Sequence, residues 1–138
     1  MSRRILLSLA GVLLAMGAAV TPAAADPPME FTDSFTFTDV NPCSGLDHEV
    51  TIDSEIRLHQ HQDRVVVHVR RTGSTDSGYV MEHGVLSFQD NGKVVTQSFS
   101  DNWKRADGSK FKAQGTFVLD LSTNTVQVDR FSLRCIKP

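Results

Sequence analysis

Glu82 and Asp101 are the two residues whose types and positions could support acid–base chemistry. Between them lies Asn91-Gly92, a dipeptide that favours a two-residue type I′ hairpin turn. That turn would place Glu82 directly opposite Asp101, on a face that is otherwise apolar. Two facing carboxylates on such a surface raise the pKa of one of them, as general acid–base catalysis requires. The alternatives are a barrel rim in water, or a β-bulge that turns both carboxylates outward.

Two of the five histidines have a spacing that could bind a metal ion. His59 and His61 alternate, so on a strand both rings would lie on one face. No third ligand follows at a fixed spacing, and Gln60 and Gln62 separate the histidines, so we expect a solvated turn and no cofactor. The chain also has no Gly-x-Ser-x-Gly nucleophile motif and no phosphate-binding glycine loop.

Aromatic side chains could line a binding pocket for a small apolar molecule. A small barrel either fills its interior with side chains or holds one small ligand, and a packed aromatic core is the default interpretation. The polar loop from Gly73 to Gly78 could instead contact an extracellular protein. The candidate ligand-binding residues are Tyr79, Phe88, Phe99, Trp103 and Phe111.

The first 25 residues have the pattern of a secretory signal peptide. Two arginines precede an apolar run, and Ala23-Ala24-Ala25 provides a small-residue cleavage site. The expected localisation is therefore extracytoplasmic, with the export route left open. In an oxidising compartment, the two cysteines of the chain, Cys43 and Cys135, favour a structural disulfide over a redox pair or a metal site.

Residues 26–138 form one domain large enough for a single core. Loss of Arg3 and Arg4 with the signal, and of no acidic residue, changes the net charge from −2 to −4. An acidic surface argues against nucleic acid or an anionic membrane as a partner. No membrane span is expected in the mature chain, and we expect a monomer.

Apolar and polar residues alternate along almost the whole mature chain, which predicts about seven antiparallel strands joined by short turns. We expect an all-β, up-and-down meander that forms a closed or nearly closed small β-barrel, with a β-sandwich as the alternative. The clearest strand has its inward residues at His48, Val50, Ile52, Ser54, Ile56 and Leu58.

The turns predict the pairing of the later strands. The Asn91-Gly92 turn would place Phe88 opposite Val95, whereas a three-residue loop at 106–108 would place Trp103 opposite Phe111. A change of parity in the last strand predicts a β-bulge near Asp129-Arg130. In a seven-strand meander the first and last strands run the same way, so Cys43 and Cys135 would meet at one rim.

The segments Asn41-Pro42-Cys43-Ser44-Gly45, His48 to Leu58 and Arg130 to Cys135 resemble those of a group of small exported bacterial proteins, mainly from actinobacteria. Members share an Asn-Pro-Cys segment near the mature start and a final strand ending in cysteine. The resemblance covers most of the mature chain, but its motifs are structural and imply no catalytic residue. The architecture is more loosely similar to lipocalin-like and allene-oxide-cyclase-like barrels.

The sequence thus predicts a secreted, non-enzymatic binding protein for a small apolar molecule or an extracellular protein partner. Two alternatives remain open. One is an isomerase-like or cyclase-like barrel enzyme that uses Glu82 and Asp101, and the other is an interaction or inhibitor protein that acts through residues 73–78.

Overall fold

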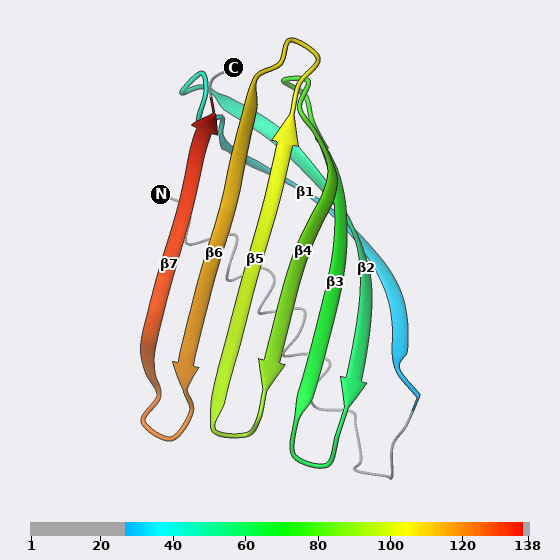
Figure 1. Ribbon diagram of the computed structural model, residues 1–138, viewed down its shortest axis with the longest axis vertical. Coiled ribbons are helices and arrows are strands. Elements are labelled where there is room, and N and C mark those ends of the chain that lie inside the picture. The colour runs from blue at the N-terminus through cyan, green and yellow to red at the C-terminus, as the bar shows by residue number, and fades with distance from the viewer. Residues whose placement is uncertain (1–26, 137–138) are drawn as a thin grey trace.

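Seven antiparallel strands make up the fold, as the alternating pattern predicts (Figure 1). The computed structural model describes residues 27–136, so the predicted signal peptide lies outside the described residues. No helix in this described part is long and apolar enough to cross a membrane. The strands are β1 (Met29–Val40), β2 (Asp47–Gln60), β3 (Val65–Thr75), β4 (Val80–Asp90), β5 (Val94–Lys104), β6 (Lys110–Asp120) and β7 (Thr125–Ile136).

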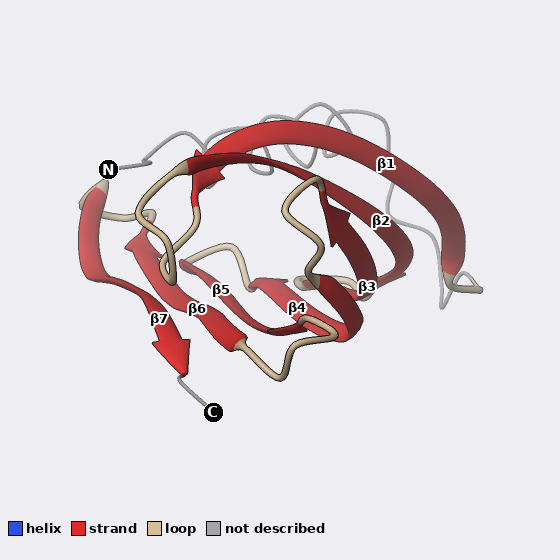
Figure 2. Ribbon diagram, turned by 90° about the horizontal axis from the view of Figure 1, so that it is seen from above, coloured by secondary structure: helices blue, strands red, loops and turns tan. Residues whose placement is uncertain are grey.

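The strands form one sheet in chain order, and this sheet curls strongly so that one face lies inside (Figure 2). Among the described residues, β1 pairs only with β2 and β7 only with β6, so the sheet is not closed. The nearly closed form of the prediction is therefore confirmed.

Two apolar clusters fill the inside of the curled sheet. Their positions follow the predicted inward face of β2, because Val50 and Ile52 belong to one cluster and Ile56 and Leu58 to the other. Ser54 lies between them, and it is buried too. The first cluster is completed by Tyr79, Met81, Trp103 and Phe111, and the second by Val67, Val69 and Leu86.

The predicted disulfide joins the two edges of the sheet at one end. Cys43 follows β1, Cys135 lies in β7, and their Cα atoms are 4.9 Å apart with a sequence separation of 92. Closure of a loop of this length stabilises the folded state by about 4–5 kcal/mol in the chain-entropy model. The disulfide is also of the kind that persists in an oxidising, extracytoplasmic environment.

The hairpin between β5 and β6 has the predicted register. Trp103 pairs with Phe111 and Phe99 pairs with Gly115. The backbone N–H of Arg105 donates to the carbonyl oxygen of Ser109, which leaves three residues in the loop. Gly108 has a φ of 88°, the left-handed conformation that this type of loop requires at its glycine.

The predicted register between β4 and β5 is wrong by two residues. Asp90 pairs with Val95, and the N–H of Asn91 donates to the carbonyl oxygen of Val94, so the two residues of the loop are Gly92 and Lys93 rather than Asn91 and Gly92. The side-chain oxygen Oδ1 of Asn91 accepts hydrogen bonds from the N–H groups of Lys93 and Val94, at 3.0 and 2.8 Å. A type I′ turn needs a positive φ at Asn91, whereas here only Gly92 in this turn has one. Side-chain capping by Asn91 therefore favours a turn that lies one residue later in the chain.

Two bulges set which residues face inward. In β7 the predicted bulge is present but falls earlier than expected, because Val118 pairs with Val128 and Leu119 with Val126, leaving Gln127 extra. A second bulge, which the sequence interpretation missed, lies in β4 between Val80 and Gly84. It reverses the parity of β4, so that Met81 faces inward there and Val80 is exposed.

Candidate functional site

The structure does not bring Glu82 and Asp101 together. The bulge in β4 turns Glu82 outward, where its side chain is 58% exposed and forms an ion pair with Lys104 at 2.8 Å. Asp101 faces the interior and pairs in register with Gly84. The expected acidic pair is therefore wrong, because one extra residue in β4 places the two carboxylates on opposite faces of the sheet.

Asp101 instead forms a buried ion pair with Arg71 of β3. Atom Nη2 of Arg71 donates to both carboxylate oxygens of Asp101, each at 2.8 Å. The two side chains are only 2% and 5% exposed. The guanidinium carbon of Arg71 also lies 5.3 Å from the centre of the Phe99 ring, within the range of a cation–π contact.

A glycine on the strand between them makes this pair possible. Arg71 pairs with Gly84 on one side of β4, and Gly84 pairs with Asp101 on the other. A Cβ atom at position 84 would collide with Oδ1 of Asp101 and with the sulfur of Met81. Because Gly84 has no side chain, Arg71 can reach across β4 to Asp101.

Burial dominates the electrostatics of the pair. It raises the pKa of Asp101 to about 6, although the charge and hydrogen bonds of Arg71 oppose the shift. Burial also lowers the pKa of Arg71 from its ordinary value, although the charge and hydrogen bond of Asp101 oppose this, and a guanidinium stays protonated in proteins. At pH 7.5 both groups are charged, and the pair as a whole is neutral.

Two buried nitrogen donors, one in this pair and one in a residue that lines the same cavity, have no hydrogen-bond partner among the described residues. They are Nε of Arg71 and Nε2 of Gln97, which points inward from β5. A buried donor left without a partner costs about 1–3 kcal/mol. Native folds seldom retain such a group without a reason.

Both residues line a cavity of about 50 Å³ inside the curled sheet. A buried water needs about 10–15 Å³ of such space, so the cavity holds a few non-hydrogen atoms. Asp39, His48 and Asp101 add polar groups to its wall. The remaining wall is mainly apolar and includes Phe37, Phe99, Trp103, Phe111, Phe131 and Leu133.

The five aromatic candidates separate into two groups. Tyr79, Trp103 and Phe111 pack together, with ring centres 5.4 Å apart for Trp103 and Phe111 and 4.8 Å apart for Tyr79 and Phe111. Phe88 and Phe99 are half-buried against the other cluster. Trp103, Phe111 and Phe99 line the cavity, whereas Tyr79 and Phe88 belong to the packing around it.

His48 connects the cavity to the loop after β3. Its Nδ1 shares a hydrogen bond of 2.7 Å with Oγ of Ser77, which in turn lies 3.0 Å from Oγ1 of Thr75. Burial lowers the pKa of His48, although the charges of Asp39 and Asp76 oppose this. The hydroxyl groups of residues 73–78 thus hold the loop in place.

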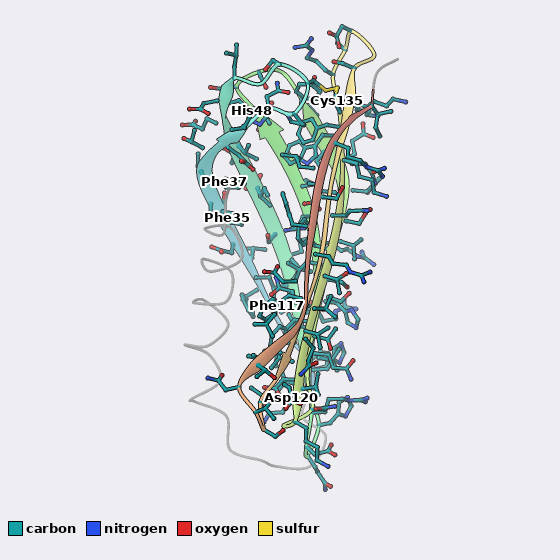
Figure 3. All side chains as sticks on the ribbon, turned by 90° about the vertical axis from the view of Figure 1, so that its left-hand side faces the viewer. Phe35, Phe37, His48, Phe117, Asp120 and Cys135 are labelled. Carbon is teal, nitrogen blue, oxygen red and sulfur yellow. A yellow bond between two sulfur atoms is a disulfide. The ribbon has the colours of Figure 1, made fainter. Side chains whose placement is uncertain are left out.

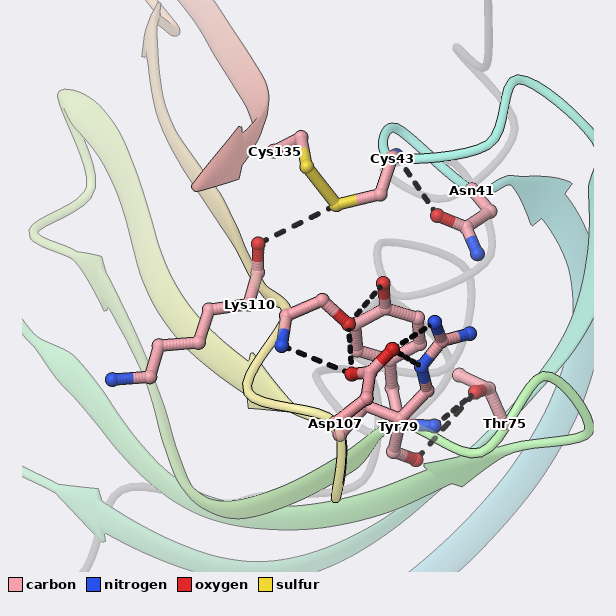
Figure 4. A network of polar contacts seen from close by, with 9 residues as sticks. Asn41, Cys43, Thr75, Tyr79, Asp107, Lys110 and Cys135 are labelled. Atoms are coloured by element: carbon pink, nitrogen blue, oxygen red, sulfur yellow. Dashed lines mark hydrogen bonds and ion pairs between the residues drawn. A yellow bond between two sulfur atoms is a disulfide. The ribbon is translucent and has the colours of Figure 1, made fainter. Parts of the chain in front are cut away.

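A second polar network stiffens the rim next to the disulfide (Figure 4). The hydroxyl of Tyr79 donates to Oγ of Ser109 at 3.1 Å, and Ser109 donates to Oδ1 of Asp107 at 2.5 Å. Arg105 forms an ion pair with Asp107, and its guanidinium carbon lies 5.2 Å from the centre of the Tyr79 ring. These contacts hold the β5–β6 loop against the end of the core.

The two histidines considered as metal ligands do not form a metal site with other residues. His59 lies at the end of β2 with its ring centre 6.2 Å from that of His68, and His61 lies in the following turn. Residues 27–136 contain no group of three or more His, Cys, Asp or Glu side chains that could hold a metal ion.

Arg71 and Gln97 are the site residues that sequence reasoning missed. Arg71 continues the inward parity of Val67 and Val69, and Gln97 shares the inward parity of Trp103. A charged or amide side chain at an inward position of an otherwise apolar strand face is the sequence pattern that could have identified both residues. The partner of Arg71 was not visible, because the β4–β5 register was needed to find it.

The chain was compared with protein-family models, curated proteins and solved structures, and none of them matches it significantly.

Proposed function

We propose that this protein is an extracytoplasmic, non-enzymatic binding protein for a small uncharged molecule with an apolar body and a hydrogen-bond acceptor. The observation that carries the proposal is the pair of unpartnered donors, Arg71 Nε and Gln97 Nε2, in residues that line a mainly apolar cavity. An acceptor oxygen placed in the cavity would satisfy them.

The charge of the site favours a neutral ligand. Arg71 is already neutralised by Asp101, so an anionic ligand would face the carboxylate without a free positive charge. A carbonyl, ether or hydroxyl oxygen needs only the N–H donors. The size of the cavity, about 50 Å³, limits the part held inside to the group that bears the acceptor.

The stability cost of this arrangement supports a functional role. A buried ion pair is often no more stabilising than apolar residues of similar volume. Here it comes with two unsatisfied donors, each of which costs about 1–3 kcal/mol. Sites that bind ligands commonly carry such costs, because the groups are arranged for the ligand rather than for the fold.

Binding is tested with two probes that differ only in the acceptor, acetophenone and α-methylstyrene, at pH 7.5. Trp103, the single tryptophan of the chain, lines the cavity and reports binding by its fluorescence. We expect acetophenone to bind at least about fivefold more tightly, because two hydrogen bonds of about 0.5–1.5 kcal/mol each are gained. Gln97→Leu should lower this ratio, and Gln89→Leu, at an exposed position of β4, should leave it unchanged.

Equal binding of the two probes, or no response of Trp103 to either, would contradict the proposal. So would a ratio that Gln97→Leu does not change. Native mass spectrometry of the purified protein gives an independent check, because a retained small molecule should be lost from the Gln97→Leu variant.

A further inference from the structure

The two edge strands of the sheet, β1 and β7, are not paired with each other. An added strand between them could pair with both edges in the same sense. β1 and β7 run the same way, since six reversals separate them, and their ends meet at the Cys43–Cys135 disulfide. Direct pairing of β1 with β7 would therefore be parallel, in a sheet that is otherwise antiparallel. A strand that is antiparallel to one edge is antiparallel to both, and would make an eight-stranded antiparallel barrel.

The disulfide limits where such a strand fits. Neighbouring strands lie about 4.7–4.9 Å apart, so an inserted strand needs about 10 Å between the two edges. At the disulfide the two Cα atoms are only 4.9 Å apart, and no strand can lie between them. The space for an added strand is therefore along the earlier part of β7, residues 125–133. Figure 3 views the molecule from the side where β1 and β7 are the edges.

The inner side of this edge is mainly apolar and incompletely covered, with Asp129 as its acidic residue, since Asp129 pairs with the inward Phe117. Phe131 faces inward by its pairing with Gly115, yet it remains 47% exposed. Its ring centre lies 6.1 Å from that of Phe99. Phe131 and Leu133 of β7 line the same cavity as Phe37 and Val40 of β1, so side chains on an added strand would reach between them.

The outer side of this edge is basic. Arg130 and Arg134 are exposed on the outer face of β7, and Lys112 pairs with Arg134 in register. Among the described residues, none of these three forms an ion pair with an acidic side chain, since the four ion pairs lie elsewhere. Acidic side chains on the outer face of an added strand would complement this charge.

We propose that the free edge of β7 binds an extended peptide segment of a partner protein, in which apolar residues alternate with acidic residues. The peptide pairs antiparallel to β7 through backbone hydrogen bonds, its apolar side chains cover Phe131, and its acidic side chains lie next to Arg130. This is recognition by strand addition, in which the backbone contributes affinity and the alternating side chains contribute specificity. The proposal rests on the strand topology and not on the small-molecule ligand, although Phe131 and Leu133 also line the cavity proposed for that ligand.

The probe is an acetylated, amidated eight-residue peptide of alternating valine and glutamate, studied with the full mature protein. Calorimetry measures its affinity, and hydrogen exchange measures protection of the β7 backbone amides. We expect at least tenfold weaker binding for a valine–lysine peptide. We also expect loss of binding when alternate peptide nitrogens are methylated, because the backbone ladder cannot form. Arg130→Glu should reverse the preference for glutamate over lysine, whereas Arg70→Glu, exposed on β3, should not.

Three results would overturn the proposal. One is the absence of binding by either peptide, and another is binding with protection confined to strands other than β7 and β1. The third is a protein that is dimeric without peptide and has its β7 amides protected, which would assign the edge to a second copy of the chain.

Discussion

Replacing Arg71 alone should destabilise the protein much more than replacing both members of the buried ion pair. In Arg71→Met, Asp101 is left 5% exposed with no cation beside it. Removal of one partner from a buried pair costs about 3–5 kcal/mol, mainly because the remaining charge is desolvated. In the double variant Arg71→Met/Asp101→Leu no charge remains, and stability should equal that of the original protein or exceed it by about 1–4 kcal/mol.

The assay is urea denaturation at pH 7.5, followed by circular dichroism and by Trp103 fluorescence. A matched control is Glu82→Gln, which removes an exposed acidic group from its ion pair with Lys104 and should not change the urea midpoint measurably. The reasoning also predicts that the stable double variant prefers acetophenone over α-methylstyrene less strongly, because only the Gln97 donor remains. If the single and double variants are equally stable, the burial argument for this pair is refuted.

The original protein and the double variant should also differ in how their free energy of unfolding depends on pH. The pKa of Asp101 is about 6 in the folded protein, above its ordinary value of 3.8. The folded state thus holds this proton more tightly than the unfolded state, so the contribution of Asp101 to stability is fully present below pH 4 and is lost as the pH rises through 6. Between pH 4.5 and 7.5, the free energy of unfolding of the original protein should fall relative to that of the double variant. An identical pH profile for the two would contradict this assignment.

Three further predictions test other parts of the structure. Cys43→Ser with Cys135→Ser should lower the free energy of unfolding by about 4–5 kcal/mol in urea, while ligand binding remains detectable in the folded fraction. Gly115→Ala should cost about 1–3 kcal/mol in the same assay, because its Cβ would lie 2.5 Å from Cε1 of Phe99; an unchanged midpoint would show that Phe99 can move aside. Burial lowers the pKa of His48 in the folded protein from its ordinary value of 6.5. The stability that this shift contributes is therefore present above pH 6.5 and is lost as the pH falls through the folded pKa. His48→Gln should remove this part of the pH profile of melting.

Some features of the fold could be predicted because they depend on local residue patterns. The inward face of β2 follows from alternation, and each of its predicted residues is buried. The β5–β6 register follows from Gly108, since only one loop length keeps Trp103 and Phe111 on the same face. The β4–β5 register was mispredicted because the oxygen of Asn91 caps a turn that lies one residue later, an interaction that the Asn-Gly pair does not reveal.

The candidate site was the hardest part to predict, because it depends on three strands at once. Arg71, Gly84 and Asp101 come from β3, β4 and β5, and they meet only when both registers and the bulge in β4 are correct. The error of two residues in the β4–β5 hairpin put Glu82 in place of Gly84 opposite Asp101, and the missed bulge in β4 concealed that Glu82 faces outward. The sequence marked Asp101 as a residue on an apolar face, but its partner came from another strand.

The sequence by itself determined the strand count, the inward face of β2 and the disulfide, since each follows from alternation, turn residues or the number of cysteines. The tertiary structure decided how far the sheet curls, where its bulges lie and which polar groups share the interior. These depend on sums of small twists and on side chains that cap or fill particular spaces, such as the one above Gly84. Local patterns determined the strands, and long-range packing determined the site between them.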